Sequence, residues 1–91
     1  MFLIFLKESM ELDPYESVSF YIEADDFYTI DAFCDEQDIN CELTVDDEIV
    51  ENIFISKKTD VPKAIRSLID KIPLTPAEKS RYQEIITKSE E

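Results

Sequence analysis

Glycine and histidine are both absent from this 91-residue chain, and each absence excludes a group of functional motifs. Phosphate-binding loops, dinucleotide-binding fingerprints, nucleophile elbows and EF-hand calcium loops all need glycine where a side chain would block the backbone. Without histidine the chain lacks the commonest general base and the commonest transition-metal ligand. The remaining catalytic chemistry is a pair of carboxylates, as in a glycosidase or a magnesium-dependent hydrolase. Because so short a chain leaves little room for a substrate cleft beside its core, we expect no enzyme, no cofactor and no bound metal.

Cysteine is scarce, and long apolar runs are missing. The two cysteines, Cys34 and Cys41, are expected to be free, buried thiols. The apolar start, residues 1–6, is shorter than the core of a secretory signal and precedes Lys7 instead of following basic residues. No run approaches the roughly 18 apolar residues of a membrane span. We therefore expect a cytoplasmic protein.

Positive charge is missing from nearly half of the chain. Between Glu8 and Glu51 there are sixteen Asp and Glu residues and no Lys or Arg, whereas residues 57–91 hold eight basic and six acidic residues. With Lys7 included, 22 acids against nine cations give a net charge of −13. A field of one sign steers association with a partner of the opposite sign. The acidic face over residues 8–51 therefore predicts a basic protein partner, and it disfavours direct binding to nucleic acid, whose phosphates it would repel.

Length and composition predict one folded domain over residues 1–91. A chain of this size normally builds a single core. The hydrophobic share of 44% distinguishes the sequence from disordered acidic tails, which lack the apolar surface needed to offset chain entropy.

Two strands are predicted near the amino terminus. Residues 2–6 form a continuous apolar run, typical of a strand buried on both faces, although a short buried helix has the same pattern. Residues 17–24 alternate, with Val18, Phe20 and Ile22 on one face, and they predict the clearest strand.

The middle of the chain predicts a helix and a hairpin. Asp25 is placed to cap a helix over residues 26–38, and Asn40 is placed to end it in a left-handed conformation. Residues 41–45 and 48–56 predict two strands of a hairpin that turns at the two aspartates between them.

The last third, residues 60–88, is predicted to be helical. Apolar residues at helical spacing predict a helix over residues 60–72, which Pro73 ends. Residues 75–78 (Thr-Pro-Ala-Glu) combine an N-cap, a proline at the first helical position and a capping box, so they start a second helix. The predicted order is β-β-α-β-β-α-α, an α+β fold with helices packed on a small, mainly antiparallel sheet.

On the predicted first helix, Tyr28, Asp31, Asp35 and Asp38 fall at positions i, i+3, i+7 and i+10. The three aspartates would follow one another at about 5 to 6 Å, with the phenol at the head of the row. Tyr21 and Tyr28 lie opposite the apolar stripes and are predicted to be exposed anchors of an interface. The candidate partner-binding residues are Tyr28, Asp31, Asp35, Glu36, Asp38, Glu42, Asp46, Asp47 and Glu48.

A simpler interpretation is a solvated acidic surface. Surfaces adapted only for solubility mix both signs of charge, and this region contains one sign. The ordinary share of Lys and Arg after residue 56 also argues against adaptation of the whole chain to high salt.

The charge pattern favours a small acidic inhibitor that occupies the basic groove of a nuclease or related nucleic-acid enzyme. Carboxylates accept hydrogen bonds from Arg and Lys as phosphates do, and complementary charge speeds encounter. Immunity proteins and antitoxins against nuclease toxins, and phage proteins that disarm restriction or CRISPR nucleases, face the same electrostatic problem, and this chain resembles them in charge and size only. The alternative is a non-inhibitory acidic adaptor or regulatory subunit that contacts a basic protein surface. Neither hypothesis defines the oligomeric state.

Overall fold

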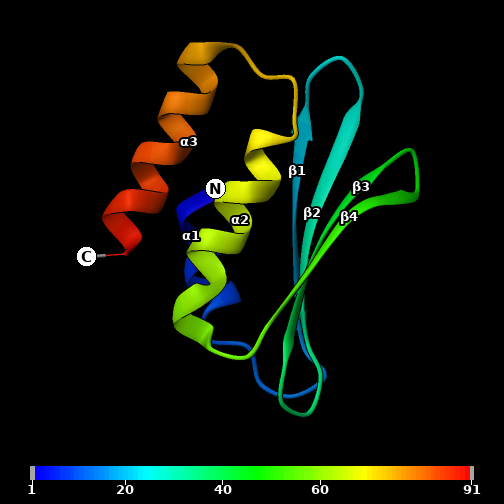
Figure 1. The fold of residues 1–91 in the computed structure, drawn as a ribbon, viewed down its shortest axis with the longest axis vertical. Helices are drawn as coiled ribbons and strands as arrows, with labels where there is room; N and C mark the ends of the chain where they lie inside the picture. Colours follow the sequence, from blue (N-terminus) through cyan, green and yellow to red (C-terminus); the bar gives the residue numbers. More distant parts are fainter. Residues whose placement is uncertain (1, 91) are drawn as a thin grey trace.

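Three α-helices lie on one side of a four-stranded antiparallel sheet in the computed structural model, which describes residues 2–90 (Figure 1). The predicted α+β class and antiparallel sheet are confirmed. The elements in chain order are α1 (Phe2–Ser9), β1 (Ser17–Glu23), β2 (Phe27–Cys34), β3 (Ile39–Val45), β4 (Glu48–Ile55), a 3-10 helix (Lys58–Asp60), α2 (Val61–Asp70) and α3 (Pro76–Ser89). The sheet order is β1-β2-β3-β4, so each strand pairs with its neighbour in sequence.

The first predicted strand is a helix. In α1 the side chains of Phe2, Phe5, Leu6 and Ser9 are buried, which is the i, i+3, i+4, i+7 spacing of one helical face. The Ser9 hydroxyl donates a 2.7 Å hydrogen bond to the Phe5 carbonyl oxygen, so this polar residue sits on the buried face at little cost. The helical period becomes visible only when residues beyond the apolar run are included.

The predicted helix over residues 26–38 is also wrong, since this segment forms β2 and the turn that follows it. In β2 every second side chain is buried, from Tyr28 to Cys34, and the strand pairs with both β1 and β3. Asp35 does not continue a helix: its Oδ1 accepts hydrogen bonds from the backbone N–H groups of Gln37 (3.0 Å) and Asp38 (2.9 Å) and so closes the turn. Asn40 lies within β3 and terminates nothing. The element order is therefore α-β-β-β-β-α-α.

The predicted hairpin forms as β3 and β4, with Asp46 and Asp47 at its turn. Both residues have left-handed backbone, with φ of 52° and 65°, as a two-residue type I′ turn requires. Aspartate takes the place that glycine usually fills, and it does so because a short polar side chain tolerates this conformation better than most.

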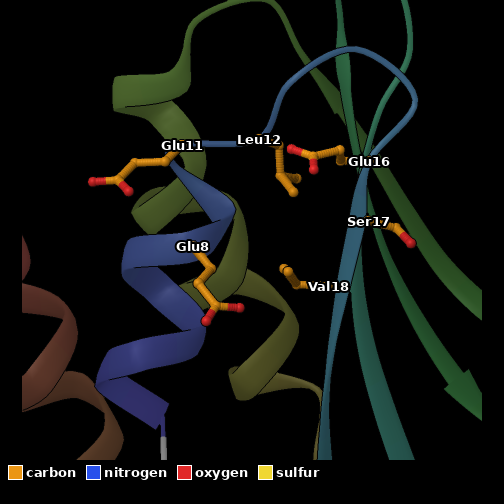
Figure 2. Close-up of a pocket in the computed structure, with 6 residues that line it drawn as sticks. All are labelled: Glu8, Glu11, Leu12, Glu16, Ser17 and Val18. Carbon is orange, nitrogen blue, oxygen red and sulfur yellow. The ribbon is translucent and has the colours of Figure 1, made fainter.

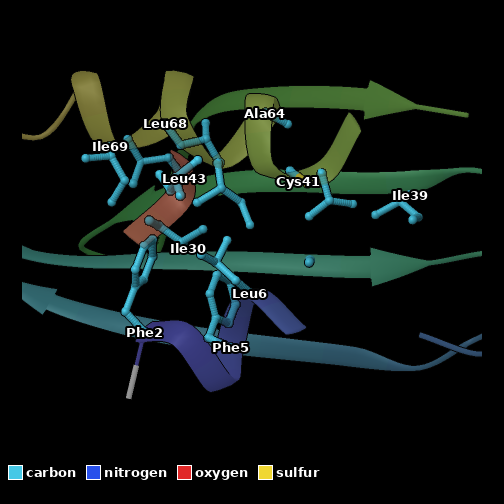
Figure 3. Packing of buried hydrophobic residues seen from close by; sticks show 14 of the residues in the cluster. Phe2, Phe5, Leu6, Ile30, Ile39, Cys41, Leu43, Ala64, Leu68 and Ile69 are labelled. Carbon is cyan, nitrogen blue, oxygen red and sulfur yellow. The ribbon is translucent and has the colours of Figure 1, made fainter. Parts of the chain in front are cut away.

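The two C-terminal helices are confirmed, including the capping box of α3 between Thr75 and Glu78. α1 packs on β1, whereas α2 packs on β3 and β4. The core lies between the helices and the sheet, where Leu6 and Leu68 meet Ile30 and Leu43 of the central strands (Figure 3). This arrangement leaves the other face of the sheet without a covering layer within the described chain (Figure 1).

Candidate functional site

Two turns bring five carboxylates to one end of the sheet. In a sheet of this connectivity the β1–β2 and β3–β4 turns lie at the same end, and they are seen at that end in Figure 1. We define the acidic tip as the five exposed residues Asp25, Asp26, Asp46, Asp47 and Glu48.

The carboxylates of the acidic tip are close enough to repel one another. The pKa of Asp46 is raised above its usual value, and the largest cause is the negative charge of Asp26 on the neighbouring turn. The adjacent charges of Asp47 and Glu48 raise it further. Because like charges favour the protonated form, the tip holds its negative charge at a cost in folding free energy.

Tyr28 supports the acidic tip from inside the protein. Its side chain is only 8% exposed, so the prediction of an exposed anchor is wrong. Its hydroxyl donates a 2.7 Å hydrogen bond to Oδ1 of Asp25, and this bond, together with burial and the nearby negative charges, raises the pKa of Tyr28 to about 12. Tyr28 therefore holds one carboxylate of the tip in place and leaves little of its own side chain exposed.

The anion row predicted from Tyr28 to Asp38 does not form. In a strand, side chains alternate between the two faces, so Tyr28 points into the core whereas Asp31 lies on the open face of the sheet. Asp35 and Asp38 lie in the β2–β3 turn, at the end of the sheet opposite the acidic tip. At ~3.3 Å per residue, the length of β2 separates the two ends by roughly 25 Å.

The β2–β3 turn is a second acidic region. Asp35, Glu36 and Asp38 are exposed there and line a shallow hollow with Tyr15 and Gln37. The Tyr15 hydroxyl donates a 2.9 Å hydrogen bond to Oε1 of Glu36, and this bond raises the pKa of Tyr15. The pKa of Asp35 is lowered, because the backbone N–H groups of Asp38 and Gln37 stabilise its charged form.

A further acidic hollow lies between α1 and the start of β1, in a place that the candidate residues did not include. Glu8, Glu11 and Glu16 line it together with the apolar side chains of Leu12 and Val18, and its volume is about 240 Å³ (Figure 2). In the sequence, Glu8 and Glu11 are three residues apart, which would place them on the same side of a helix. Because residues 2–6 were predicted to be a strand, this spacing was not used to group the two glutamates.

Within residues 2–90, the three cations that form ion pairs do so away from the acidic tip. Arg66 pairs with Glu90 at 2.9 Å and Lys88 with Glu84 at 3.4 Å, both in the helical layer. Lys71 reaches Glu51 of β4 at 3.7 Å. None of the five carboxylates of the acidic tip forms an ion pair with a described residue, so no described cation neutralises their charge.

Comparisons with family models, with curated proteins and with solved structures gave no match. In the part of the chain that the structure describes, no helix is both long enough and apolar enough to cross a membrane. The same part contains no group of three Cys, Asp or Glu side chains arranged to hold a metal ion. Both cysteines are buried as free thiols, as expected, and burial raises the pKa of Cys41 to about 11.

Proposed function

We propose that this protein is a small acidic inhibitor that binds the basic nucleic-acid-binding site of a nuclease or related enzyme and excludes its substrate. The observation that carries the proposal is the acidic tip, in which two separate turns present five exposed carboxylates without an intramolecular cation among the described residues.

The chemistry of the tip suits a site built for phosphates. Arginine forks bind carboxylate and phosphate oxygens in the same bidentate geometry. The carboxylates on the two turns offer such acceptors, and a basic groove would relieve the repulsion that raises the pKa of Asp46. Two effects would then favour binding: attraction between the acidic tip and the basic partner, and relief of the repulsion within the tip.

The inhibitor would be expected to associate rapidly at low salt. Complementary fields raise association rates by orders of magnitude and lose this effect as salt screens them. The chain carries a net charge of −13, and its acids lie mainly in the sheet and its loops whereas its cations lie mainly in the helical layer. The molecule therefore has an electrostatic polarity that orients it as it approaches a basic surface.

The first experiment identifies and then uses the partner. The tagged protein is purified from its source cell, and the basic enzyme that co-purifies is expressed and tested for cleavage or binding of nucleic acid. Stopped-flow association with that enzyme is then measured for Asp26→Lys combined with Glu48→Lys, two exposed tip positions outside the left-handed residues of the turn. We expect association at low salt to slow by about tenfold or more, since attraction becomes repulsion.

Two further double variants make the result specific. Glu36→Lys with Asp38→Lys reverses the opposite end of the sheet and tests that region separately. Asp70→Lys with Glu84→Lys reverses two exposed acids of the helical layer and is the matched control. Association that is unchanged in both sheet-end variants would refute the proposal. Binding without any loss of enzyme activity would favour the alternative, a non-inhibitory acidic adaptor.

A further inference from the structure

The open face of the sheet lies between the two acidic ends and carries exposed apolar side chains. This face lies opposite the helices (Figure 1), and its outward side chains follow from the strand register. Several are large and exposed: Tyr21 is 61% exposed, Phe27 51%, Ile49 58% and Phe54 68%. Apolar side chains gathered on one exposed face typically mark an interaction site.

Two carboxylates occupy the centre of this face. Asp31 of β2 and Glu42 of β3 are directly opposite each other in the register, and like charges in this position destabilise a sheet. Both are half-buried and hydrogen-bonded: Asp31 accepts from the hydroxyl of Ser19, and Glu42 accepts from the Asn40 amide at 2.7 Å. No described cation pairs with either of them.

Aromatic side chains flank the carboxylate pair on both sides. Phe33 and Phe54 lie in the next cross-strand row on one side, where both pair with Asn40 of β3. On the other side Tyr21 and Phe27 stack on each other, with ring centroids 5.6 Å apart and an angle of 26° between the rings. The two rings are stacked without a partner present, and such preorganisation reduces the entropy cost of binding.

We infer that the open face binds an arginine-bearing segment of the basic partner, with a guanidinium group over the Asp31–Glu42 pair and the aromatic side chains around it. A guanidinium matches this surface better than an ammonium group does, because it binds carboxylates bidentately and stacks on aromatic rings. This inference rests on the proposed function only in taking the partner to be a basic protein.

The negative charge of the open face favours a basic segment over a second copy of this chain as its binding partner. A second copy of the chain would form a two-fold interface in which the same patch meets itself. Such an interface would bring the carboxylates of Asp31 and Glu42 against their own copies, in a protein whose net charge is −13. A basic segment removes the repulsion between these two side chains instead of doubling it.

The test uses short peptides with blocked ends and the isotope-labelled protein, followed by NMR. A peptide of alternating arginine and valine should shift the backbone signals of Tyr21, Asp31 and Glu42 in a saturable manner. A peptide of alternating lysine and valine, with the same charge, should bind about tenfold more weakly or worse. Equal affinities, or shifts confined to the turns at the sheet ends, would overturn the inference.

Two double variants test the carboxylate pair and the aromatic side chains of the open face separately. Asp31→Asn with Glu42→Gln should weaken binding of the arginine peptide by about tenfold or more, and so should Tyr21→Ala with Phe54→Ala. Ile4→Ala removes a comparably exposed side chain, 52%, from the helical layer and should change nothing. Retained affinity in both double variants, checked for native folding by their spectra, would refute the inference. Line broadening across this face with rising protein concentration and no peptide would also refute it, since the occupant would then be a second copy.

The two proposals fail in different experiments. The peptide titration involves no nucleic-acid enzyme, so saturable binding at the open face would stand even if no enzyme were inhibited. Inhibition through the acidic tip would likewise stand if the arginine peptide bound elsewhere.

Discussion

Replacing Leu68 with alanine should destabilise the fold by about 2 to 5 kcal/mol, because this side chain lies at the contact of α2 with the sheet. Leu68 is fully buried, with 0% exposure, and it contacts the cluster formed by the central strands (Figure 3). The change removes three carbon groups, worth roughly 2.4 kcal/mol at about 0.8 kcal/mol each. An unrelaxed cavity of about 70 Å³ would add roughly 1.7 kcal/mol at ~24 cal/mol per Å³.

This loss is large for a chain of 91 residues, whose total stability is expected to be roughly 5 to 14 kcal/mol. Urea unfolding followed by circular dichroism measures the change, with Lys63→Ala as the control on the exposed side of the same helix. The control should stay within about 0.5 kcal/mol of the original protein. Equal and small effects of the two changes would refute the packing of α2 on the sheet.

Three further predictions concern charge and the thiols. The melting temperature should rise when NaCl increases from about 20 mM to 0.5 M, where the Debye length falls to a few ångström; a flat or falling curve would mean that the acids are already paired. Since the pKa of Asp46 is raised in the folded state, its contribution to stability is present below the ordinary value of 3.8 and is lost as pH rises through the raised value. Asp46→Asn should therefore stabilise the protein near neutral pH more than Asp47→Asn, which has the same left-handed backbone, and the difference should vanish in thermal melts at low pH. Cys41, buried and with a pKa of about 11, should resist iodoacetamide at neutral pH in the native protein and react in urea; rapid labelling without urea would contradict its burial.

The elements that were predicted correctly are those whose structure is specified by residues close together in the sequence. The alternation in β1, the two aspartates of the β3–β4 turn and the capping box of α3 each specify a local structure through few residues. The helix α2 has an apolar stripe that recurs over its whole length, and only one packing direction buries it.

The segments predicted wrongly are those whose patterns fit two periods. In residues 26–38, Phe27, Ile30, Phe33 and Cys34 lie at helical spacing, but the even-numbered residues from Tyr28 to Cys34 also alternate as a strand requires. Neighbouring strands on both sides decided between them, since β2 pairs with β1 and β3 along its length. The sequence of residues 26–38 alone does not show that strands will pair with it on both sides.

Because residues 26–38 were predicted to be a helix, the predicted arrangement of the candidate site was also wrong. Tyr28, Asp31 and Asp35 were predicted on one helical face, whereas the strand sends them to the core, to the open face and to the far turn. The residues of the β3–β4 turn were identified because their hairpin was predicted, but their proximity to Asp26 depends on the sheet topology. The exposed positions of Phe27 and Phe33 also could not be inferred, because a helix would have buried them.

The most direct test of the proposed inhibition is a competition measurement by fluorescence anisotropy. A labelled oligonucleotide is bound to the co-purified basic enzyme, and the acidic protein is titrated into the complex. The proposal predicts complete displacement of the oligonucleotide by the original protein, and displacement at much higher concentration by the Asp26→Lys, Glu48→Lys variant. A stable ternary complex, in which the oligonucleotide stays bound while the acidic protein also binds, would contradict it.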